Sequence, residues 1–345
     1  MRRWRLSAVN RSAIVPALAG ALLLVFGALG VAAQQVHIVP RIAPPPPAAA
    51  PLPPPPAKAK GAPNPSVEIK ANVNLVLVPV TVTDPMDRLV TGLEADQFSI
   101  FEDKVPQKIK TFSTEDAPIS VGIIFDSSGS MSDKIDKSRE ALREFFRTAN
   151  PQDEFFMVDF ADEPRLLDDF TTNIDQLENS VSFLPAHGRT ALLDAIYLGL
   201  DKMRSAHHAR KALLIISDGG DNHSRYTERE IRNVVRESDV QIYAIGIFSP
   251  VGSRDTPEEA AGPSLLSDIA ETTGGRMFAI SDVDELPDVA TKIGEELRNE
   301  YVIGYSPSNL KHDGKWRKIR VKLNPPPGLP PLTVYAKTGY YAPAR

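Results

Sequence analysis

Residues 119–130 read Ile-Ser-Val-Gly-Ile-Ile-Phe-Asp-Ser-Ser-Gly-Ser, and this stretch decides the fold. Residues 119–125 form an almost continuous apolar run, which is typical of a strand that is buried on both faces of a parallel sheet. The run stops at Asp126, where polar side chains follow and Gly129 permits a tight turn. The sequence therefore predicts a buried strand that ends in a polar loop.

Similar apolar runs return along the chain and alternate with helical stretches. The predicted strands are residues 119–125, 155–160, 212–216, 240–247 and 276–280. The predicted helices are residues 134–149, 191–205, 227–237, 265–273 and 286–300. Because strands that alternate with helices form β-α-β units, we expect an α/β fold with a doubly wound, mostly parallel sheet. Ligands of such sheets bind beyond the carboxyl ends of the strands, so the loops at that edge are the candidate site.

Sequence of β character flanks this pattern on both sides. Apolar and polar residues alternate over residues 67–83, and again where Ile319, Val321 and Leu323 alternate with basic residues. We expect the two flanks to pair as one small β-sandwich-like domain, into which the α/β domain is inserted. The predicted boundaries are residues 67–116 for the first part of the β domain, 117–298 for the α/β domain and 299–345 for the second part of the β domain.

The first 66 residues have the composition of an export segment and a spacer. Four arginines precede an uncharged apolar run from Ala13 to Ala33, which ends in the small residues of a cleavage site. Residues 1–33 are therefore a signal peptide or, since the run is long enough to cross a bilayer, a retained membrane anchor. Residues 34–66 hold twelve of the 31 prolines and predict a disordered, Pro-rich linker. Both alternatives for residues 1–33 imply an exported protein that is periplasmic, secreted or membrane-anchored.

Charge and cysteine content exclude several classes of function. The 345 residues include no cysteine, which removes disulfides, thiolate zinc sites and cysteine nucleophiles. Seven Lys and Arg and no acidic residue occur before residue 66, so a net charge of −5 for the chain leaves −12 for the rest. An acidic folded part argues against nucleic acid as the main partner. Contact with a membrane is expected only through the N-terminal anchor.

Three short polar loops are expected at the same edge of the sheet. They are Asp126-Ser127-Ser128-Gly129-Ser130, Gly188-Arg189-Thr190 and Ser217-Asp218-Gly219. Together they offer carboxylate and hydroxyl oxygens and no His or Cys, a set that suits Mg²⁺ and, less specifically, Mn²⁺ or Ca²⁺. Each loop alone also has a simpler explanation, because Ser, Thr and Asp favour turns and helix caps after any buried strand. Their joint occurrence is what indicates a metal site.

At these loops the sequence resembles the von Willebrand factor A domain. The metal-ion-dependent adhesion site of that family combines Asp-x-Ser-x-Ser with a Thr and an Asp. The matching residues, a complete set, are Asp126, Ser128, Ser130, Thr190 and Asp218. The resemblance covers about residues 117–298, and the flanking segments Thr91–Asp103 and Tyr301–Tyr305 are similar to those of the bacterial VWFA-related proteins.

The resemblance implies a Rossmann-like fold and a Mg²⁺ ion held by the Ser and Thr hydroxyls, with the aspartates contacting it directly or through water. An Asp or Glu carboxylate of a protein ligand would complete the coordination. Four residues are expected at the rim that meets this ligand: Ser127, Gly129, Arg189 and Gly219. The hypothesis is an exported, metal-dependent protein-binding module for adhesion or complex assembly.

Two other classes of function stay open. The chain is alternatively a structural or assembly subunit of the cell envelope with no metal-dependent binding, or a metal-dependent hydrolase. Within the three loops no His or Glu stands as an evident base, and Ser128 lacks the Gly-x-Ser-x-Gly context of a nucleophile elbow. His187 lies beside the loop of Thr190 and is better explained as a solvated loop residue. We therefore expect no catalytic residue.

Overall fold

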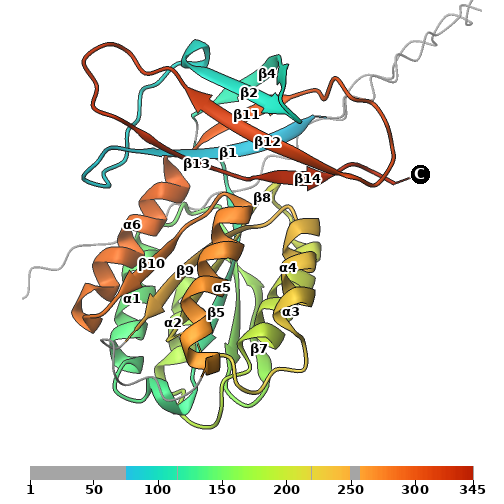
Figure 1. The fold of residues 1–345 in the computed structure, drawn as a ribbon. Helices are drawn as coiled ribbons and strands as arrows, with labels where there is room; N and C mark the ends of the chain where they lie inside the picture. The colour runs from blue at the N-terminus through green and yellow to red at the C-terminus, as the bar shows by residue number, and fades with distance from the viewer. Residues whose placement is uncertain (1–74, 115, 219, 249–256, 345) are drawn as a thin grey trace, which may run out of the picture. The chain divides into compact units, whose positions relative to one another are not determined.

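The computed structural model describes residues 75–114, 116–218, 220–248 and 257–344 (Figure 1). The predicted signal or anchor (residues 1–33), the Pro-rich linker (34–66) and Gly219 lie outside the described residues, as does the start of the first predicted strand. Within the described ranges, no helix is long and apolar enough to cross a membrane.

A six-stranded sheet in the order β10-β9-β8-β5-β6-β7 forms the centre of the α/β domain. Its strands are β5 (Ile119–Asp126), β6 (Glu154–Phe160), β7 (Pro164–Thr171), β8 (Arg210–Ser217), β9 (Gln241–Ile247) and β10 (Met277–Ile280). Every neighbouring pair is parallel except β6 and β7, which are antiparallel. The predicted mixed α/β fold with a mostly parallel sheet is therefore confirmed.

Helices cover both faces of this sheet (Figure 1). They are α1 (Ile135–Arg147), α2 (Ile174–Ser182), α3 (Leu192–Lys202), α4 (Glu228–Glu237), α5 (Pro257–Thr273) and α6 (Leu286–Arg298). Apolar side chains of α1, α2 and α6 share one buried cluster with Val121, Ile123 and Phe125 of β5. Those of α3, α4 and α5 share a second cluster with Ile124. The alternation of side chains along one strand thus supplies both cores.

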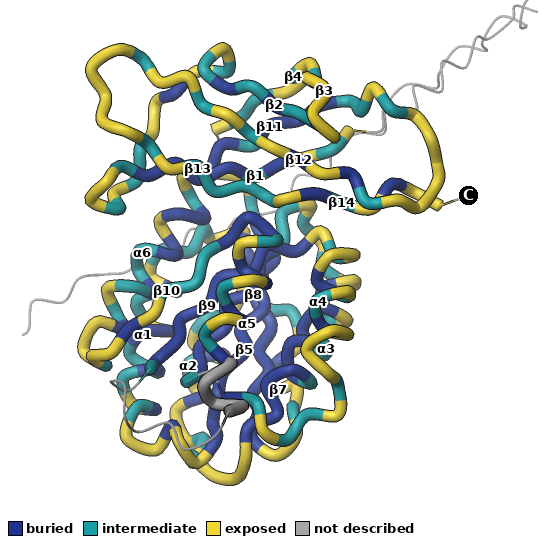
Figure 2. Tube along the Cα trace, in the orientation of Figure 1, coloured by how far each residue is buried: buried dark blue, intermediate teal, exposed yellow. Residues whose placement is uncertain are grey.

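Strand β5 is buried at all eight of its residues, between β6 and β8 (Figure 2). Gly122 makes this close packing possible. A Cβ atom at Gly122 would lie 2.3 Å from a ring carbon of Phe156 on β6 and 2.5 Å from a methyl carbon of Leu213 on β8. The side chains of Phe156 and Leu213 therefore fill the space that a side chain at position 122 would need.

The two ends of the described chain form a β-sandwich. One sheet has the order β13-β1-β11-β4 and the other β14-β12-β2-β3. The strands are β1 (Val76–Thr83), β2 (Phe98–Glu102), β3 (Val105–Gln107), β4 (Ile109–Ser113), β11 (Tyr301–Tyr305), β12 (Trp316–Leu323), β13 (Thr333–Ala336) and β14 (Gly339–Tyr341). Antiparallel pairing joins β1 to β11 and β2 to β12. Each sheet therefore contains strands from before and after the α/β domain.

An ionic cluster connects the sandwich to the α/β domain. Arg276, just before β10, forms ion pairs with Asp87 of the loop after β1 (2.6 Å) and with Glu296 of α6. Its guanidinium carbon lies 4.6 Å from the ring centre of Phe278 and 4.3 Å from that of Tyr335 on β13. Stacking and ion pairing hold this cation between three segments that are distant in sequence.

We predict that Gly122→Ala destabilises the protein by about 1–3 kcal/mol, because the added methyl group enters space occupied by two neighbouring strands. Gly199→Ala in α3 is the matched control. Its Cβ would meet the flexible end of Ile124 at 2.6 Å, and the helix gains from alanine by about 1 kcal/mol. Urea unfolding followed by circular dichroism measures both. Equal destabilisation by the two variants would contradict the argument from close packing.

We also predict a pH dependence of stability that originates at Glu296. Burial raises the pKa of Glu296 to about 7, although Arg276 beside it favours the charged form. Since the folded state then holds the proton more tightly than the unfolded chain, the stability from this group is full below its ordinary pKa of 4.5 and is lost as pH rises through about 7.

Glu296→Gln removes this titration. Between about pH 5 and about pH 8, the wild type should lose roughly 1–3 kcal/mol more unfolding free energy than Glu296→Gln does. Glu295→Gln, at the exposed neighbouring position of α6, should follow the wild type. Unfolding curves at a series of pH values test this, and parallel pH profiles for all three proteins would show the prediction to be wrong.

Candidate functional site

The predicted site residues lie in loops at the carboxyl ends of β5 and β8 and at the start of α3. The parallel pairing of β5 with β8 brings Asp126 beside Ser217, whose hydroxyl donates to Asp126 Oδ2 at 2.6 Å. Asp126 Oδ1 accepts from the backbone N–H of Ser128 at 2.8 Å. The first carboxylate of the set is therefore fully buried and held by two donors.

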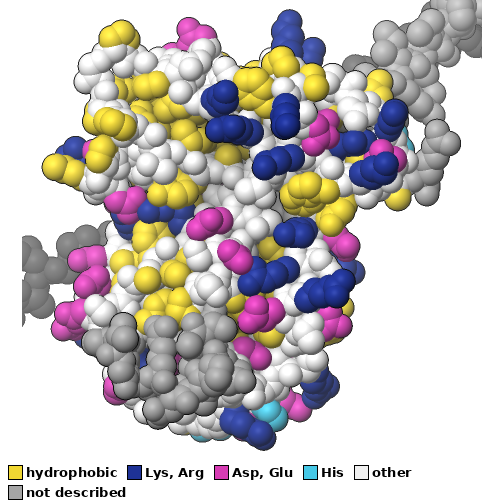
Figure 3. Space-filling view, in the orientation of Figure 1, with side chains coloured by type: hydrophobic (Ala, Val, Ile, Leu, Met, Phe, Trp, Pro, Cys, Tyr) yellow, Lys and Arg dark blue, Asp and Glu magenta, His cyan; other side chains and the backbone are white. Residues whose placement is uncertain are grey.

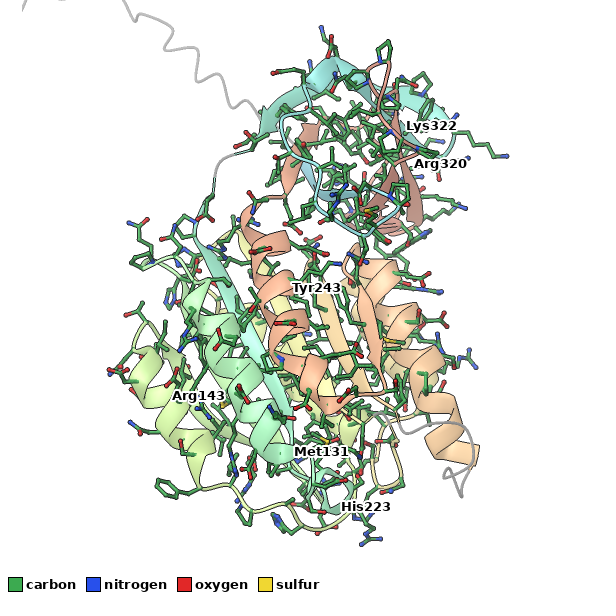
Figure 4. The ribbon with its side chains drawn as sticks, turned by 90° about the vertical axis from the view of Figure 1, so that its left-hand side faces the viewer. Met131, Arg143, His223, Tyr243, Arg320 and Lys322 are labelled. Atoms are coloured by element: carbon green, nitrogen blue, oxygen red, sulfur yellow. The ribbon has the colours of Figure 1, made fainter. Side chains whose placement is uncertain are left out.

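Backbone hydrogen bonds join the three loops to one another. His187 N donates to Ser127 O at 2.9 Å, and Gly129 N donates to Gly188 O at 3.1 Å. On the other side, Thr190 N donates to Asn222 Oδ1 at 2.9 Å, and Thr190 O accepts from Asn222 N at 3.0 Å. These contacts make the loops one connected edge, and Figure 4 shows Met131 and His223 at this end of the domain.

Electrostatics at this edge favour a cation. Burial and the negative charge of Asp218 raise the pKa of Asp126 to about 7. Two carboxylates from neighbouring strands thus repel each other across the edge, a cost that a cation between them would relieve. The hydroxyl oxygens of Ser128 and Ser130 lie 3.1 Å apart, and Thr190, only 4% exposed, lies where α3 begins. These oxygens match the chemistry of a hard divalent cation.

Lys134 is a residue of this edge that sequence reasoning missed. Its ammonium group donates to Asp218 Oδ2 at 3.0 Å and to Ser130 O at 2.9 Å. A signal for it was present, because Lys134 is the N-cap residue of α1, where Ser, Thr, Asp or Asn is preferred and a positive charge opposes the helix dipole. A cation at such a position indicates a negative partner elsewhere in the fold.

The predicted rim residues differ in their exposure. Arg189 is exposed, and Asp162 Oδ1 accepts from its backbone N–H at 3.0 Å and lies 3.4 Å from its Nε. Gly129 is also exposed. Ser127 is fully buried, and its hydroxyl donates to Phe160 O at 3.1 Å, so its side chain is directed into the domain. Gly219 is outside the described residues.

Many metal sites are built from three or more His, Cys, Asp or Glu side chains. Among the residues that the structure describes, no such group could hold an ion. The edge described above is different, since it combines two carboxylates with three hydroxyls. His187, the remaining titratable group of the loop, has its Nδ1 3.0 Å from Pro185 O and is exposed.

The fold and these loops define a class of protein. The model of the von Willebrand factor type A domain matches residues 120–292, half of the chain, and the chain belongs to this family. Domains of this family generally mediate protein–protein interactions, and they commonly bind a divalent metal.

Individual curated relatives match a smaller part of this chain than the family model does. Inter alpha-trypsin inhibitor, heavy chain 4 of Mus musculus is 29% identical over 143 residues, 37% of this chain and 15% of its own. Inter-alpha-trypsin inhibitor heavy chain H4 of Homo sapiens is 27% identical over 134 residues, 35% of this chain and 14% of its own. This chain therefore spans about one seventh of the length of these curated relatives. A solved von Willebrand factor type A structure from Catenulispora acidiphila has a TM-score of 0.47 and 15% identity, covering 78% of this chain and 75% of that one.

Proposed function

We propose that this protein is an exported binding module that takes an acidic side chain of a partner protein through a divalent cation. The cation is Mg²⁺, with Mn²⁺ or Ca²⁺ as substitutes, and its ligands are Asp126, Ser128, Ser130, Thr190 and Asp218. The single observation that carries the proposal is the connected edge, in which backbone hydrogen bonds tie together the three loops that bear these residues. The basic, apolar N-terminal sequence supports export.

Charge counting explains why an acidic partner would be favoured. Asp126, Asp218 and Lys134 together carry one net negative charge when both aspartates are ionised. A divalent cation changes this total to one net positive charge, and one carboxylate from a partner brings it to zero. The cation would supply the electrostatic attraction and an open coordination position, and the five residues of the chain would hold the cation at the edge.

A second candidate function is a structural or assembly subunit that works without metal. The contact between Lys134 and Asp218 favours it, because an ammonium group already neutralises one of the two carboxylates. Under the hydrolase alternative, an available base would be needed at the edge. We assign no catalytic residue, because the ring of His187 lies against the backbone oxygen of Pro185.

We predict that the full chain binds Mg²⁺ or Mn²⁺ and that Ser130→Ala weakens this binding at least tenfold, since it removes one hydroxyl ligand. Ser132→Ala is the matched control, because Ser132 is equally exposed two residues away and outside the set. Asp126→Asn should abolish binding, with Asp133→Asn as its control. Isothermal titration calorimetry gives the affinities, and thermal unfolding verifies that each variant is folded. Absence of any metal binding by the wild type would favour the assembly function instead.

We further predict that Lys134→Met changes the affinity for the metal and the affinity for an acidic peptide in opposite directions. Loss of the ammonium group should raise the affinity for Mg²⁺ roughly threefold to tenfold, because a positive charge near the cation is removed. The same variant should weaken the metal-dependent binding of an acidic peptide, because the metal-loaded edge no longer carries an excess positive charge. Lys137→Met, on the exposed side of α1, is the control. If Lys134→Met lowers both affinities, Lys134 holds Asp218 in place and does not compete with the metal.

A further inference from the structure

One outer face of the β-sandwich carries a row of cations. Lys318, Arg320 and Lys322 occupy alternate, exposed positions of β12, while Ile319 between them points into the core of the sandwich. Alternate residues of a strand lie about 7 Å apart on the same side of the sheet. Figure 3 shows Lys and Arg side chains gathered over this sheet, and Figure 4 shows Arg320 and Lys322 on the outer side of the sandwich.

These three cations lack acidic partners. Among the described residues, none of them takes part in an ion pair. The only acidic residue in β2, β3, β12 and β14 is Glu102, which is buried and accepts hydrogen bonds from the Tyr305 and Tyr340 hydroxyls inside the sandwich, both at 2.9 Å. One exposed carboxylate lies nearby, since Asp103 in the turn after β2 accepts a hydrogen bond from the backbone N–H of Lys318 at 3.0 Å. The three cations of the row outnumber it, and the face keeps an excess of positive charge.

Aromatic side chains accompany the row. Trp316 follows at the next position on the same side of β12, where it is half-buried at a groove shared with α4, and its ring lies 5.1 Å from that of Tyr341 on β14. At the other end, the Lys322 ammonium group lies 5.1 Å from the ring centre of Phe101 on β2. Trp and Tyr beside Lys and Arg are the combination that is enriched where a protein meets the polar headgroups of a bilayer.

The rest of the molecule has the opposite charge. Residues 115–300 carry 19 Lys and Arg against 36 Asp and Glu, whereas residues 75–114 and 301–344 carry 11 against 7. A negatively charged surface would therefore repel the α/β domain and attract the sandwich. Such a surface would bind this face in preference to any other and would fix the orientation of the molecule.

We propose that the face formed by Trp316, Lys318, Arg320, Lys322, Phe101 and Tyr341 docks onto a lipid leaflet that bears anionic headgroups. Docking there would turn the sandwich toward the membrane. Figure 4 shows Arg320 and Lys322 on one side of the sandwich and Met131 and His223 at the opposite end of the molecule, so the polar loops would stay outside the docked face. This docking is independent of the metal, because no residue of the edge takes part in it.

The test uses the full chain and a signal local to the face. The only tryptophans are Trp4 and Trp316, so Trp4→Phe leaves Trp316 as the single reporter. Its fluorescence is measured with vesicles that contain brominated lipids, either zwitterionic or with about a third of anionic phosphatidylglycerol. A local reporter is needed because the predicted N-terminal anchor would bring the chain to any bilayer.

Trp316 should be quenched by anionic vesicles and much less by zwitterionic ones, and salt should abolish the difference. Each Lys or Arg near an anionic leaflet strengthens binding about fivefold, so K318Q/R320Q/K322Q should weaken it roughly 100-fold. The matched control R143Q/R225Q/R229Q removes three exposed cations of the α/β domain and should leave quenching unchanged. Circular dichroism verifies that both triple variants are folded.

Two results would overturn the proposal. Quenching that is equal for both kinds of vesicle, or that survives K318Q/R320Q/K322Q, would mean that the row of cations does not hold the face to lipid. Absence of quenching by anionic vesicles would also contradict the proposal. If soluble polyphosphate then binds the wild type but not K318Q/R320Q/K322Q, the face belongs to a soluble polyanion.

Discussion

The register between β5 and β8 is the constraint on which the rest of the structure depends. A shift of one residue would move every side chain of β5 to the opposite face and would exchange its contacts with the two helical layers. It would also separate the Ser217 hydroxyl from Asp126, leaving a buried carboxylate with one donor fewer. The same pairing that fills both cores therefore determines where the first carboxylate of the candidate site lies. Gly122 leaves room on the face of β5 for the side chains of Phe156 and Leu213, which pack over it in this register.

The topology places the attachment of the sandwich and the polar loops of the candidate site at opposite ends of the parallel strands. Chain entry before β5 and exit after α6 occur at the amino ends of the parallel strands, where the sandwich is attached. The polar loops occupy the carboxyl ends. The ionic cluster of Asp87, Arg276 and Glu296 connects the sandwich to α6 and β10 and so stabilises the attachment. The candidate metal edge and the cationic sandwich face therefore belong to different elements, and neither has to change its packing for the other to bind.

The burial of each element explains how much of the fold and of the candidate site could be predicted from the sequence. Four of the parallel strands, β5, β6, β8 and β9, are predictable because they are covered on both faces and so are almost continuously apolar. The short edge strand β10 is only partly buried, but its run Met-Phe-Ala-Ile is still apolar enough to be predicted. Strand β7 was missed because it is a sheet edge whose sequence, Pro-Arg-Leu-Leu-Asp-Asp-Phe-Thr, mixes exposed charges with apolar residues. Helix α2 was missed because nine residues give too short a periodic pattern. The partnership of Lys134 with Asp218 joins residues 84 positions apart, so the unusual N-cap cation indicates a negative partner but does not identify which residue it is.

If the edge binds a partner as proposed, the negative charge of the α/β domain close to the edge would restrict which partners can approach it. Beyond roughly 10 Å the field of the domain is screened in physiological salt, so only charges near the edge act on a single incoming carboxylate. A strongly acidic partner would still be repelled by the carboxylates around the loops during approach. On the proposed function, a partner that presents one isolated Asp or Glu on a neutral or basic surface would avoid this repulsion and gain the full local attraction. Under the proposed function, the carboxylates near the edge would thus act as a filter on the partner, whereas the three loops would select its carboxylate.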